Sequence, residues 1–304
     1  MSVIPNWIHD LPKAAAIVHW DGHRAAFAAV NEPYCRMIGY SEEECLGKNP
    51  ADLLNGESRR LLINLIRRMQ AQRQMYAELT QITATGTEID TRVDGSLLRS
   101  DGSGRLYLIL CEDISACKWI ERELSAGQAR SSGICDPEFR IQRFDTYHQP
   151  AIAGARRYID APLFDFIAPD DRGKLLRLLD EAIELGCEQE QQLRTARFAD
   201  LFDVAVKVRV RAFFDGYGRL LRYAFVIRDL QPYEEADDPG IRLKTLMAQR
   251  NMSASQLSEA TGLSPQTISK LRSGKIRTPQ RLTAELIAAE LGVSPSRVWS
   301  KTRN

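Results

Sequence analysis

The sequence lacks any apolar run long enough to cross a membrane. A spanning helix needs about 18 to 20 consecutive apolar residues, and no stretch of the 304-residue chain approaches that length. The first residues, MSVIPNWIHDLPK, contain no apolar core of the kind found in secretory signal peptides. These absences predict a protein that stays in the cytoplasm.

Motifs of the common enzyme classes are missing as well. The chain has no phosphate-binding loop, no GxSxG turn, no HExxH zinc motif and no protein-kinase signature. Its six cysteines, at positions 35, 45, 111, 117, 135 and 187, form no CxxC pair and no Cys/His cluster with metal-ligand spacing. We therefore expect no enzymatic activity, no metal site and reduced, partly buried thiols, with a redox-sensing cysteine pair as the alternative.

Charge is distributed unevenly along the chain. The formal net charge is +1, but residues 240–304 contain eleven Lys or Arg and three Glu, so this segment carries +8 and residues 1–239 carry −7. A compact basic module attached to an acidic remainder is typical of a domain that binds nucleic-acid phosphates. The pattern favours DNA binding over the alternative, a helical bundle that binds proteins or is purely structural.

The basic segment also contains the start and stop signals of short helices. Ser253 and Gln256 have the spacing of a capping box. Gly262 suits the left-handed turn at the end of that helix, and Ser264-Pro265 supplies the start of the next one. Further starts and terminal glycines follow at Thr278-Pro279, Ser294-Pro295, Gly274 and Gly292. Helix, short glycine turn, helix is the helix-turn-helix layout, in which the second helix enters the DNA major groove.

The second of these helices has one apolar and one polar face. Ile268 and Leu271 are spaced i, i+3 and should face the bundle, so the opposite face points outward. The outward residues are Gln266, Lys270 and Ser273, with Thr267 and Arg272 on the flanks. This outward face is polar and basic.

A longer pattern shows which family the segment resembles. It consists of Leu257-Ser258, Gly262-Leu263-Ser264, Ile268-Ser269, Gly274-Lys275, Pro279, Ile287-Ala288 and Leu291-Gly292-Val293-Ser294. Over the last fifth of the chain these residues resemble the phage-repressor (Cro/XRE-like) helix-turn-helix family. The sequence departs from that family at Ala254, where a phosphate-contacting glutamine is frequent, and at Arg272, where many members have Glu.

The resemblance implies site residues and a partner. The residues expected at base edges are Gln266, Thr267 and Lys270. The residues expected at phosphates are Ser264, Ser273, Lys275 and Arg277. The implied partner is double-stranded DNA with a near-palindromic operator, bound by a homodimer whose two helices occupy half-sites about 34 Å apart.

The first part of the chain predicts an α+β domain with an antiparallel sheet and short helices. The expected strands are residues 14–20, 25–30, 75–83, 89–98 and 106–111, with an amphipathic helix over 58–74. The motifs Val30-Asn31, Gly39-Tyr40-Ser41-Glu42-Glu43, Leu46-Gly47-Lys48 and Asp113-Ile114-Ser115 resemble the PAS sensor family. That resemblance implies an apolar pocket or a cofactor between sheet and helices, and a closing triplet that passes a signal to the next helix.

An internal repeat indicates a second, divergent copy of this domain. The run DGSGRL at 101–106 recurs as DGYGRL at 215–220, and each run is followed by a strand-like segment. Residues 165–172 resemble the start of the long PAS helix, residues 175–185 are apolar at helical spacing, and valines alternate with basic residues over 204–211. The segment 141–159 is eroded, which weakens the expectation of an intact second pocket.

The predicted architecture is therefore two α+β PAS domains followed by an all-α helix-turn-helix bundle. The expected boundaries are a first PAS domain at 1–115, a helical linker at 116–133, a second PAS domain at 134–231, an acidic linker at 232–240 and the helix-turn-helix at 241–304. In the first linker, residues 125–133 are rich in small side chains and are expected to connect the two domains. The apolar stripe at positions 114, 117, 120 and 124 suits either pairing with a second chain or packing on its own domain.

The resemblance to PAS sensors also bears on cofactors. PAS proteins that bind haem generally offer a histidine on the long helix, and the histidines at 9, 19, 23 and 148 lie on neither candidate helix. Light-sensing flavin domains carry a cysteine after the asparagine, but here Pro50 follows Asn49, which excludes covalent flavin photochemistry. Non-covalent flavin, a small apolar metabolite and no ligand at all stay open. The candidate pocket residues are Trp20, Tyr107 and Cys111, for which plain core packing is the alternative.

Together these patterns predict a DNA-binding transcriptional regulator whose PAS domains sense a small ligand or a redox state and control a dimeric helix-turn-helix. Two alternatives stay open. One is a constitutive repressor whose PAS domains serve only as a dimerisation scaffold. The other is a regulator that holds flavin as a redox sensor.

Overall fold

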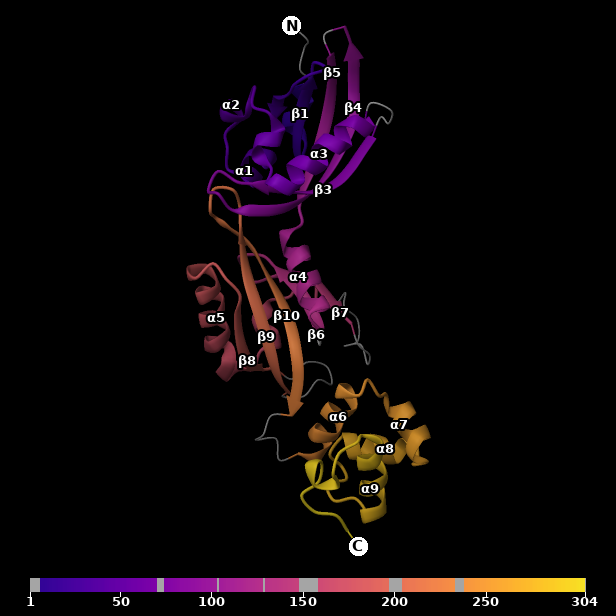
Figure 1. Cartoon of the computed structure of the whole chain (residues 1–304). Coiled ribbons are helices and arrows are strands. Elements are labelled where there is room, and N and C mark those ends of the chain that lie inside the picture. Colours follow the sequence, from indigo (N-terminus) through magenta and orange to yellow (C-terminus); the bar gives the residue numbers. More distant parts are fainter. Residues whose placement is uncertain are drawn as a thin grey trace. The chain divides into compact units, whose positions relative to one another are not determined.

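The chain folds into two PAS-like α+β domains and a helical domain (Figure 1). The computed structural model describes residues 6–69, 74–102, 104–127, 129–147, 158–196, 204–232 and 238–303. Within these ranges no helix is long and apolar enough to span a membrane. The predicted fold class, two antiparallel sheets with short helices followed by a helical bundle, is confirmed.

The first domain is a five-stranded antiparallel sheet with short helices on one face (Figure 1). Its strands are β1 (Ala14–Trp20), β2 (Ala25–Val30), β3 (Gln74–Ile82), β4 (Glu88–Asp101) and β5 (Gly104–Asp113), in the order β2-β1-β5-β4-β3. Its helices are η1 (Asn6–Asp10), α1 (Glu32–Ile38), α2 (Glu42–Cys45), η2 (Pro50–Leu53) and α3 (Gly56–Met69). The five expected strands are confirmed. The helix expected over 58–74 is described over 56–69, and positions 70–73 lie outside the described residues.

Asn31 explains why α1 begins directly after β2. Its side chain is fully buried, and its Oδ1 atom accepts hydrogen bonds from the Tyr34 N–H at 3.1 Å and from the Ala15 N–H at 2.9 Å. Its amide nitrogen donates to the carbonyls of Ile8 and Lys13. The hydrogen bond from the Tyr34 N–H makes Asn31 the N-cap of α1. One buried amide therefore joins the amino-terminal segment, β1 and α1, and its burial is tolerated because its polar atoms are paired.

The second domain repeats the topology of the first sheet. Its strands are β6 (Ala129–Cys135), β7 (Ile141–Thr146), β8 (Gln189–Arg194), β9 (Val204–Phe214) and β10 (Leu220–Pro232), in the order β7-β6-β10-β9-β8. Its helices are η4 (Leu163–Phe166), η5 (Pro169–Asp171) and α5 (Arg172–Glu184). The alternation predicted for β9 is confirmed, because Val206, Val208 and Val210 are buried. The two DGxGRL runs lie at equivalent connections of the two sheets, between β4 and β5 and between β9 and β10.

The linker expected over residues 125–133 is wrong at its carboxyl end. The helix α4 (Ser115–Ser125) is followed by β6, a strand that lies between β7 and β10. A Cβ atom on Gly133 would lie 2.3 Å from the Cζ atom of Phe225 and 2.8 Å from the carbonyl oxygen of Arg143. The small residues that suggested a linker therefore leave room for an aromatic ring of the neighbouring strand. The second domain begins near Ala129 rather than at position 134.

The apolar stripe predicted at positions 114, 117, 120 and 124 is buried in part. Ile114 and Ile120 are each 2% exposed, whereas Cys117 and Leu124 are half-buried. On another face of the helix, the Glu123 carboxylate forms ion pairs with Arg209, at 3.2 Å, and with Arg228. Ile114 and Ile120 thus pack on their own chain, as in the second of the two alternatives, while Cys117 and Leu124 stay partly accessible.

The carboxyl-terminal domain is a bundle of short helices. These are α6 (Pro239–Gln249), α7 (Ala254–Thr261), α8 (Pro265–Arg272), α9 (Arg281–Glu290) and the 3-10 helix η6 (Pro295–Arg297). The bundle begins two residues before the predicted boundary at 241, because the Asp238 side chain caps α6 by accepting a hydrogen bond from the Gly240 N–H at 2.8 Å. The acidic linker therefore ends in the cap of the first helix.

The helix start expected at Thr278-Pro279 is also wrong. The helix α9 begins at Arg281, after Gln280. The Pro279 carbonyl accepts a hydrogen bond from the Arg303 N–H at 2.8 Å, and the Arg303 carbonyl accepts one from the Arg281 N–H at 2.8 Å. This pairing with the last residues of the chain holds positions 279–280 extended and delays the helix. It is a long-range contact that a Thr-Pro signal does not reveal.

Candidate DNA interface and sensor cavities

Local signals fix the two helices of the candidate DNA interface. The Ser253 hydroxyl accepts a hydrogen bond from the Gln256 N–H at 3.2 Å, and the Gln256 side chain accepts one from the Ser253 N–H at 2.8 Å. This is the capping box predicted for α7. Gly262 ends α7 with a φ of 69°. The Ser264 hydroxyl then caps α8 by accepting from the Thr267 N–H at 3.1 Å.

Buried side chains hold α8 against the bundle. Leu257, Ile268 and Leu271 are 0% exposed. Because these residues occupy the inner face, the opposite face of α8 is turned to solvent. The residues predicted at base edges lie there, with Gln266 and Lys270 exposed and Thr267 half-buried. The helix is therefore rigidly seated and its polar face is accessible.

The residues predicted at phosphates are on the surface as well. The exposed set is Ser264, Ser273, Lys275 and Arg277. Two of these hydroxyls also make local hydrogen bonds. The Ser264 Oγ atom lies 2.9 Å from the Thr267 Oγ1 atom, and the Ser273 hydroxyl donates to the Lys270 carbonyl at 3.2 Å. A phosphate contact from either serine would have to share or replace that bond.

Other donors on this surface are not engaged by the rest of the domain. Among the described residues, none forms a hydrogen bond or an ion pair with the side chains of Gln266, Lys270 or Lys275. Ser269 is also exposed on α8 and was missed by the sequence pattern, although its i, i+3 spacing from Gln266 could have included it. An amide can pair with adenine and an ammonium group can donate to guanine, so this face has the chemistry to read bases.

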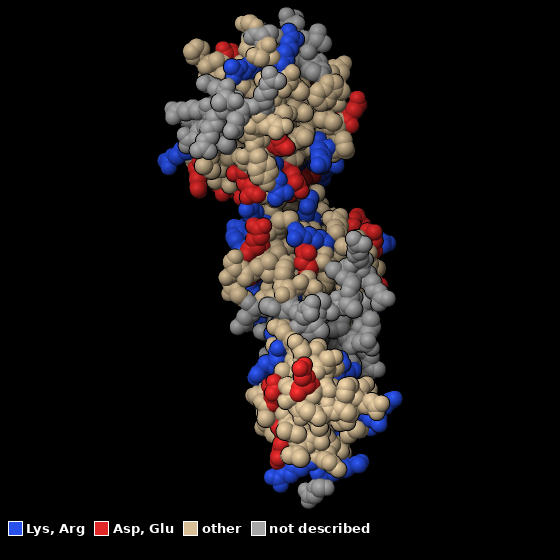
Figure 2. All heavy atoms as spheres, turned by 90° about the vertical axis from the view of Figure 1, so that its right-hand side faces the viewer, with Lys and Arg blue, Asp and Glu red and all other residues tan. Residues whose placement is uncertain are grey.

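The surface around these helices is basic. Residues 240–304 contain eleven Lys or Arg and three Glu. In Figure 2, blue side chains lie along the lower margin of this domain. A surface of this kind attracts the phosphate backbone of any DNA sequence and makes the affinity dependent on salt.

A cavity of about 90 Å³ lies between the sheet and the helices of the first domain. The three residues predicted for its wall, Trp20, Tyr107 and Cys111, all line it. Pro50, at the start of η2, lines it too. The position at which the flavin-photosensor pattern would require a cysteine thus faces the cavity, and here it carries no reactive group.

One group of polar side chains interrupts the apolar wall. The Gln81 Nε2 atom donates to the Thr91 Oγ1 atom at 3.1 Å, and the Tyr34 hydroxyl donates to the Gln81 Oε1 atom at 3.4 Å. The Cys111 sulfur lies 3.9 Å from Gln81 Nε2. Gln81 was not predicted, yet it occupies the same inward phase of β3 as the buried Leu79, where a polar residue is unexpected. An apolar wall with one convergent polar group is typical of a small-molecule site.

Two family models match the chain in the regions just described. Residues 21–116 match a PAS domain, and residues 242–296 match a Cro/C1-type HTH DNA-binding domain. The chain carries a PAS domain and a Cro/C1-type helix-turn-helix. It is 48% identical over 66 residues to the HTH-type transcriptional regulator PrtR of Pseudomonas aeruginosa, a match that covers 22% of this chain and 24% of that protein. The similarity thus spans about a quarter of that relative's length.

Solved structures are similar to this chain over somewhat more than a third of its length. The PAS domain of a Colwellia psychrerythraea protein matches 36% of this chain and 92% of its own, with 15% identity and a TM-score of 0.32. A LOV protein of Rhodobacter sphaeroides matches 38% of this chain and 70% of its own, with 16% identity and a TM-score of 0.33.

The thiols of the PAS domain are held in their protonated form at neutral pH. Burial raises the pKa of Cys35 and the pKa of Cys111 to about 12, and burial also raises the pKa of Cys45. In the second domain burial raises the pKa of Cys135 to about 12. The thiolate is the form that reacts with oxidants and disulfides. These environments therefore argue against the redox-sensing cysteine pair.

Thiol labelling should follow this order of burial. We expect a maleimide at about pH 7.5 to modify Cys187 first, because that side chain is exposed, while Cys35 and Cys111 react only after unfolding. Peptide mass spectrometry of samples labelled with and without urea measures the order. Rapid labelling of Cys35 or Cys111 in the folded protein would contradict the pKa directions.

The second, PAS-like domain also encloses a cavity, of about 110 Å³. Aromatic rings form part of its wall: the Phe144 and Tyr158 centroids lie 4.7 Å apart, and the Tyr158 and Phe166 centroids 5.2 Å apart. Phe144 and Tyr158 belong to the segment 141–159 that reads as eroded. Residues of that segment therefore line the cavity, and the expectation of a less intact second pocket is corrected. Positions 148–157 lie outside the described residues.

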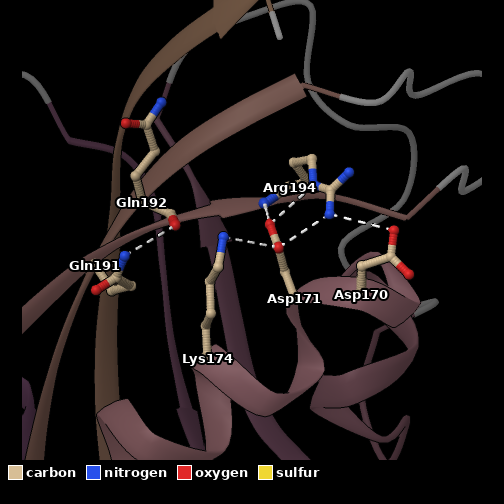
Figure 3. Close-up of polar contacts among 6 residues, drawn as sticks. All are labelled: Asp170, Asp171, Lys174, Gln191, Gln192 and Arg194. Atoms are coloured by element: carbon tan, nitrogen blue, oxygen red, sulfur yellow. Dashed lines mark hydrogen bonds and ion pairs between the residues drawn. The ribbon is translucent and has the colours of Figure 1, made fainter. Parts of the chain in front are cut away.

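A buried ion pair ties the start of α5 to β8 (Figure 3). The Asp171 carboxylate accepts hydrogen bonds from the Arg194 N–H at 2.8 Å, from Nε at 3.1 Å and from Nη2 at 3.1 Å, and it lies 3.0 Å from the Lys174 Nζ atom. The Arg194 guanidinium also reaches the exposed Asp170 at 3.3 Å. The bonds from Arg194 hold the pKa of Asp171 well below its usual range, despite burial. Because its charges are paired with one another, this cluster is a structural tie rather than a ligand site.

Proposed function

We propose that the protein is a dimeric, sequence-specific regulator of transcription that acts in the cytoplasm and binds a near-palindromic DNA operator through α8. The base-contacting residues of the proposal are Gln266, Thr267 and Lys270, and the phosphate-contacting residues are Ser264, Ser273, Lys275 and Arg277. The observation that carries it is the exposed, unengaged pair Gln266 and Lys270 on a helix fixed by a fully buried core. Helices with this seating read the major groove.

The first cavity supports a sensory role for a small apolar molecule with one hydrogen-bonding group. The group would meet Gln81, and the apolar part would meet Trp20 and Tyr107. The protonated thiols favour ligand sensing over a redox-sensing cysteine pair. Non-covalent flavin stays the alternative to a small metabolite. Binding would shift the placement of the two DNA-reading helices of a dimer.

Selection of bound sequences from a random DNA pool by the full-length protein tests the DNA-binding part. We expect enrichment of an inverted repeat, with half-site centres about 34 Å apart. Enrichment of no sequence at moderate salt would overturn the proposal. The visible absorption spectrum, with native mass spectrometry of the purified protein, tests the sensory part. A ligand-free protein whose DNA affinity ignores added metabolites would favour the scaffold alternative.

Two substitutions separate base reading from phosphate binding. We expect Gln266→Ala to lower discrimination between the selected operator and a mismatched one by about 1–3 kcal/mol, since a bidentate pair with a base is lost. We expect Lys275→Ala to weaken all DNA sequences alike and to flatten the slope of log K against log salt by about 0.9. Fluorescence anisotropy at several salt concentrations measures both. Equal, sequence-independent effects from the two changes would refute the assigned roles.

A further inference from the structure

The turn between β9 and β10 is rigid. The Asp215 carboxylate accepts hydrogen bonds from the Tyr217 N–H at 3.0 Å, from the Arg219 N–H at 2.9 Å and from the Arg219 Nε–H at 3.0 Å. Asp215 is itself buried. Residues 213–221 form one compact unit with residues 1–121. The turn of the second sheet therefore belongs structurally to the first PAS domain.

The contact between this turn and α1 is made by backbone. The Gly216 N–H donates to the Arg36 carbonyl in the last turn of α1 at 2.9 Å. Gly39, which ends α1 with a φ of 79°, lies against Gly216 so closely that a Cβ atom on Gly216 would sit 2.0 Å from the Gly39 nitrogen. No side chain could relieve that overlap, because the atoms that a Cβ would meet are main-chain atoms. Glycine at position 216 is therefore a requirement of the contact.

A ring contact lies at the base of the same turn. Phe213, at the end of β9, packs edge-on against the buried Trp119 of α4, with ring centroids 6.4 Å apart. The turn is thus held at its base by a ring contact and at its tip by backbone.

The helix that receives the turn also borders the first cavity. Tyr34 on α1 lines that cavity and donates its hydroxyl to Gln81. In the last turn of α1, the Arg36 carbonyl accepts a hydrogen bond from the Gly216 N–H, and the Ile38 carbonyl accepts one from the Ala84 N–H at 2.8 Å. A helix of seven residues leaves little length in which a shift at Tyr34 could be absorbed before it reaches Arg36.

We propose that the β9–β10 turn is a docking element by which the first PAS domain controls the second sheet: a displacement of α1 by a molecule in the first cavity is passed through Gly216 to β9 and β10. This inference rests on the proposed sensory role of the first cavity. The strands β9 and β10 carry the displacement into the second sheet, and β10 is the last strand before the DNA-binding domain.

The repeated turn supplies a matched control. Gly102 occupies in DGSGRL the position that Gly216 occupies in DGYGRL. A Cβ atom on Gly102 would meet nothing within 4 Å, and neither glycine has a positive φ. Alanine is therefore tolerated by the backbone at both positions, and only Gly216→Ala is expected to break a contact.

Amide hydrogen exchange on the full chain tests the docking. In the wild-type protein the amide at position 216 should be protected by the Arg36 carbonyl. In Gly216→Ala the exchange of the turn and of the last turn of α1 should become at least about tenfold faster, and Gly102→Ala should leave both unchanged. An unprotected amide at position 216 of the wild type, or equal effects of the two substitutions, would overturn the inference.

The transmission step is tested with a perturbation inside the cavity. Tyr34→Phe removes the hydroxyl that binds Gln81 and serves as the probe. We expect it to change amide exchange in β9 and β10 when the turn is intact and to leave those strands unchanged in the Gly216→Ala background. A response of the same size in both backgrounds, or in neither, would overturn the proposal. Operator binding by the same samples is measured separately, so that a failed coupling is distinguished from a failed DNA-binding function.

Discussion

Replacing Leu271 with alanine should destabilise the carboxyl-terminal domain strongly and weaken operator binding. Leu271 is 0% exposed and joins α8 to the core of the bundle. Truncating a buried leucine to alanine costs about 2–5 kcal/mol. A domain of this length has a total stability of roughly 3–10 kcal/mol, so a large share of it would be lost. Circular dichroism during thermal unfolding, with anisotropy on the selected operator, measures both effects.

The same domain contains a matched control. Leu282 on α9 is 67% exposed. We expect Leu282→Ala to change the stability by no more than about 0.5 kcal/mol and to leave operator binding intact, because no cavity is created. A folded Leu271→Ala variant with wild-type operator affinity would show that the packing of α8 does not govern the interface.

Replacing Asp171 with alanine should destabilise the second domain by about 3 kcal/mol, since removing the buried partner of this ion pair leaves Arg194 with only the exposed Asp170. The Asp171 side chain is 3% exposed, and it holds Arg194 on β8 at the start of α5. The neighbouring Asp170 has an 81% exposed side chain and a single contact to the same guanidinium. Asp170→Ala is the control, and it should cost well under about 1 kcal/mol.

The contribution of this pair should depend on pH in one direction. Because the folded state holds the pKa of Asp171 below its usual 3.8, the unfolded chain takes up the proton first as the pH falls. The stabilisation is therefore fully present above about pH 4 and is lost progressively below it. Denaturant unfolding monitored by hydrogen exchange of α5 and β8 measures the effect. Equal pH dependence in Asp171→Ala and the wild type between pH 2 and 5 would contradict it.

Local sequence patterns made most of the fold readable from the sequence. The apolar run of residues 14–20, the period-two pattern of residues 204–211 and the repeated DGxGRL turns each reflect local geometry that a single segment specifies. The caps of α7 and α8 were predicted for the same reason, because Ser253, Gln256 and Ser264 act within three residues of their partners.

The features that sequence reasoning missed depend on distant partners. Gly133 of β6 faces Phe225 on another strand, and Pro279 pairs with Arg303. Likewise, the role of Gln81 in the first cavity depends on Tyr34 and Thr91, which lie on other elements. None of these partners is specified by residue type or spacing alone, so only the folded structure brings them together.

Pro50 in the wall of the first cavity bears on whether a bound molecule could be held covalently or only reversibly. Neither Pro50 nor the protonated Cys111 gives the described wall a reactive group that could form a covalent bond with a bound molecule. Binding would then be reversible, and the occupancy of the cavity would follow the free concentration of the bound molecule. A regulator built in this way responds to present supply and retains no record of past exposure.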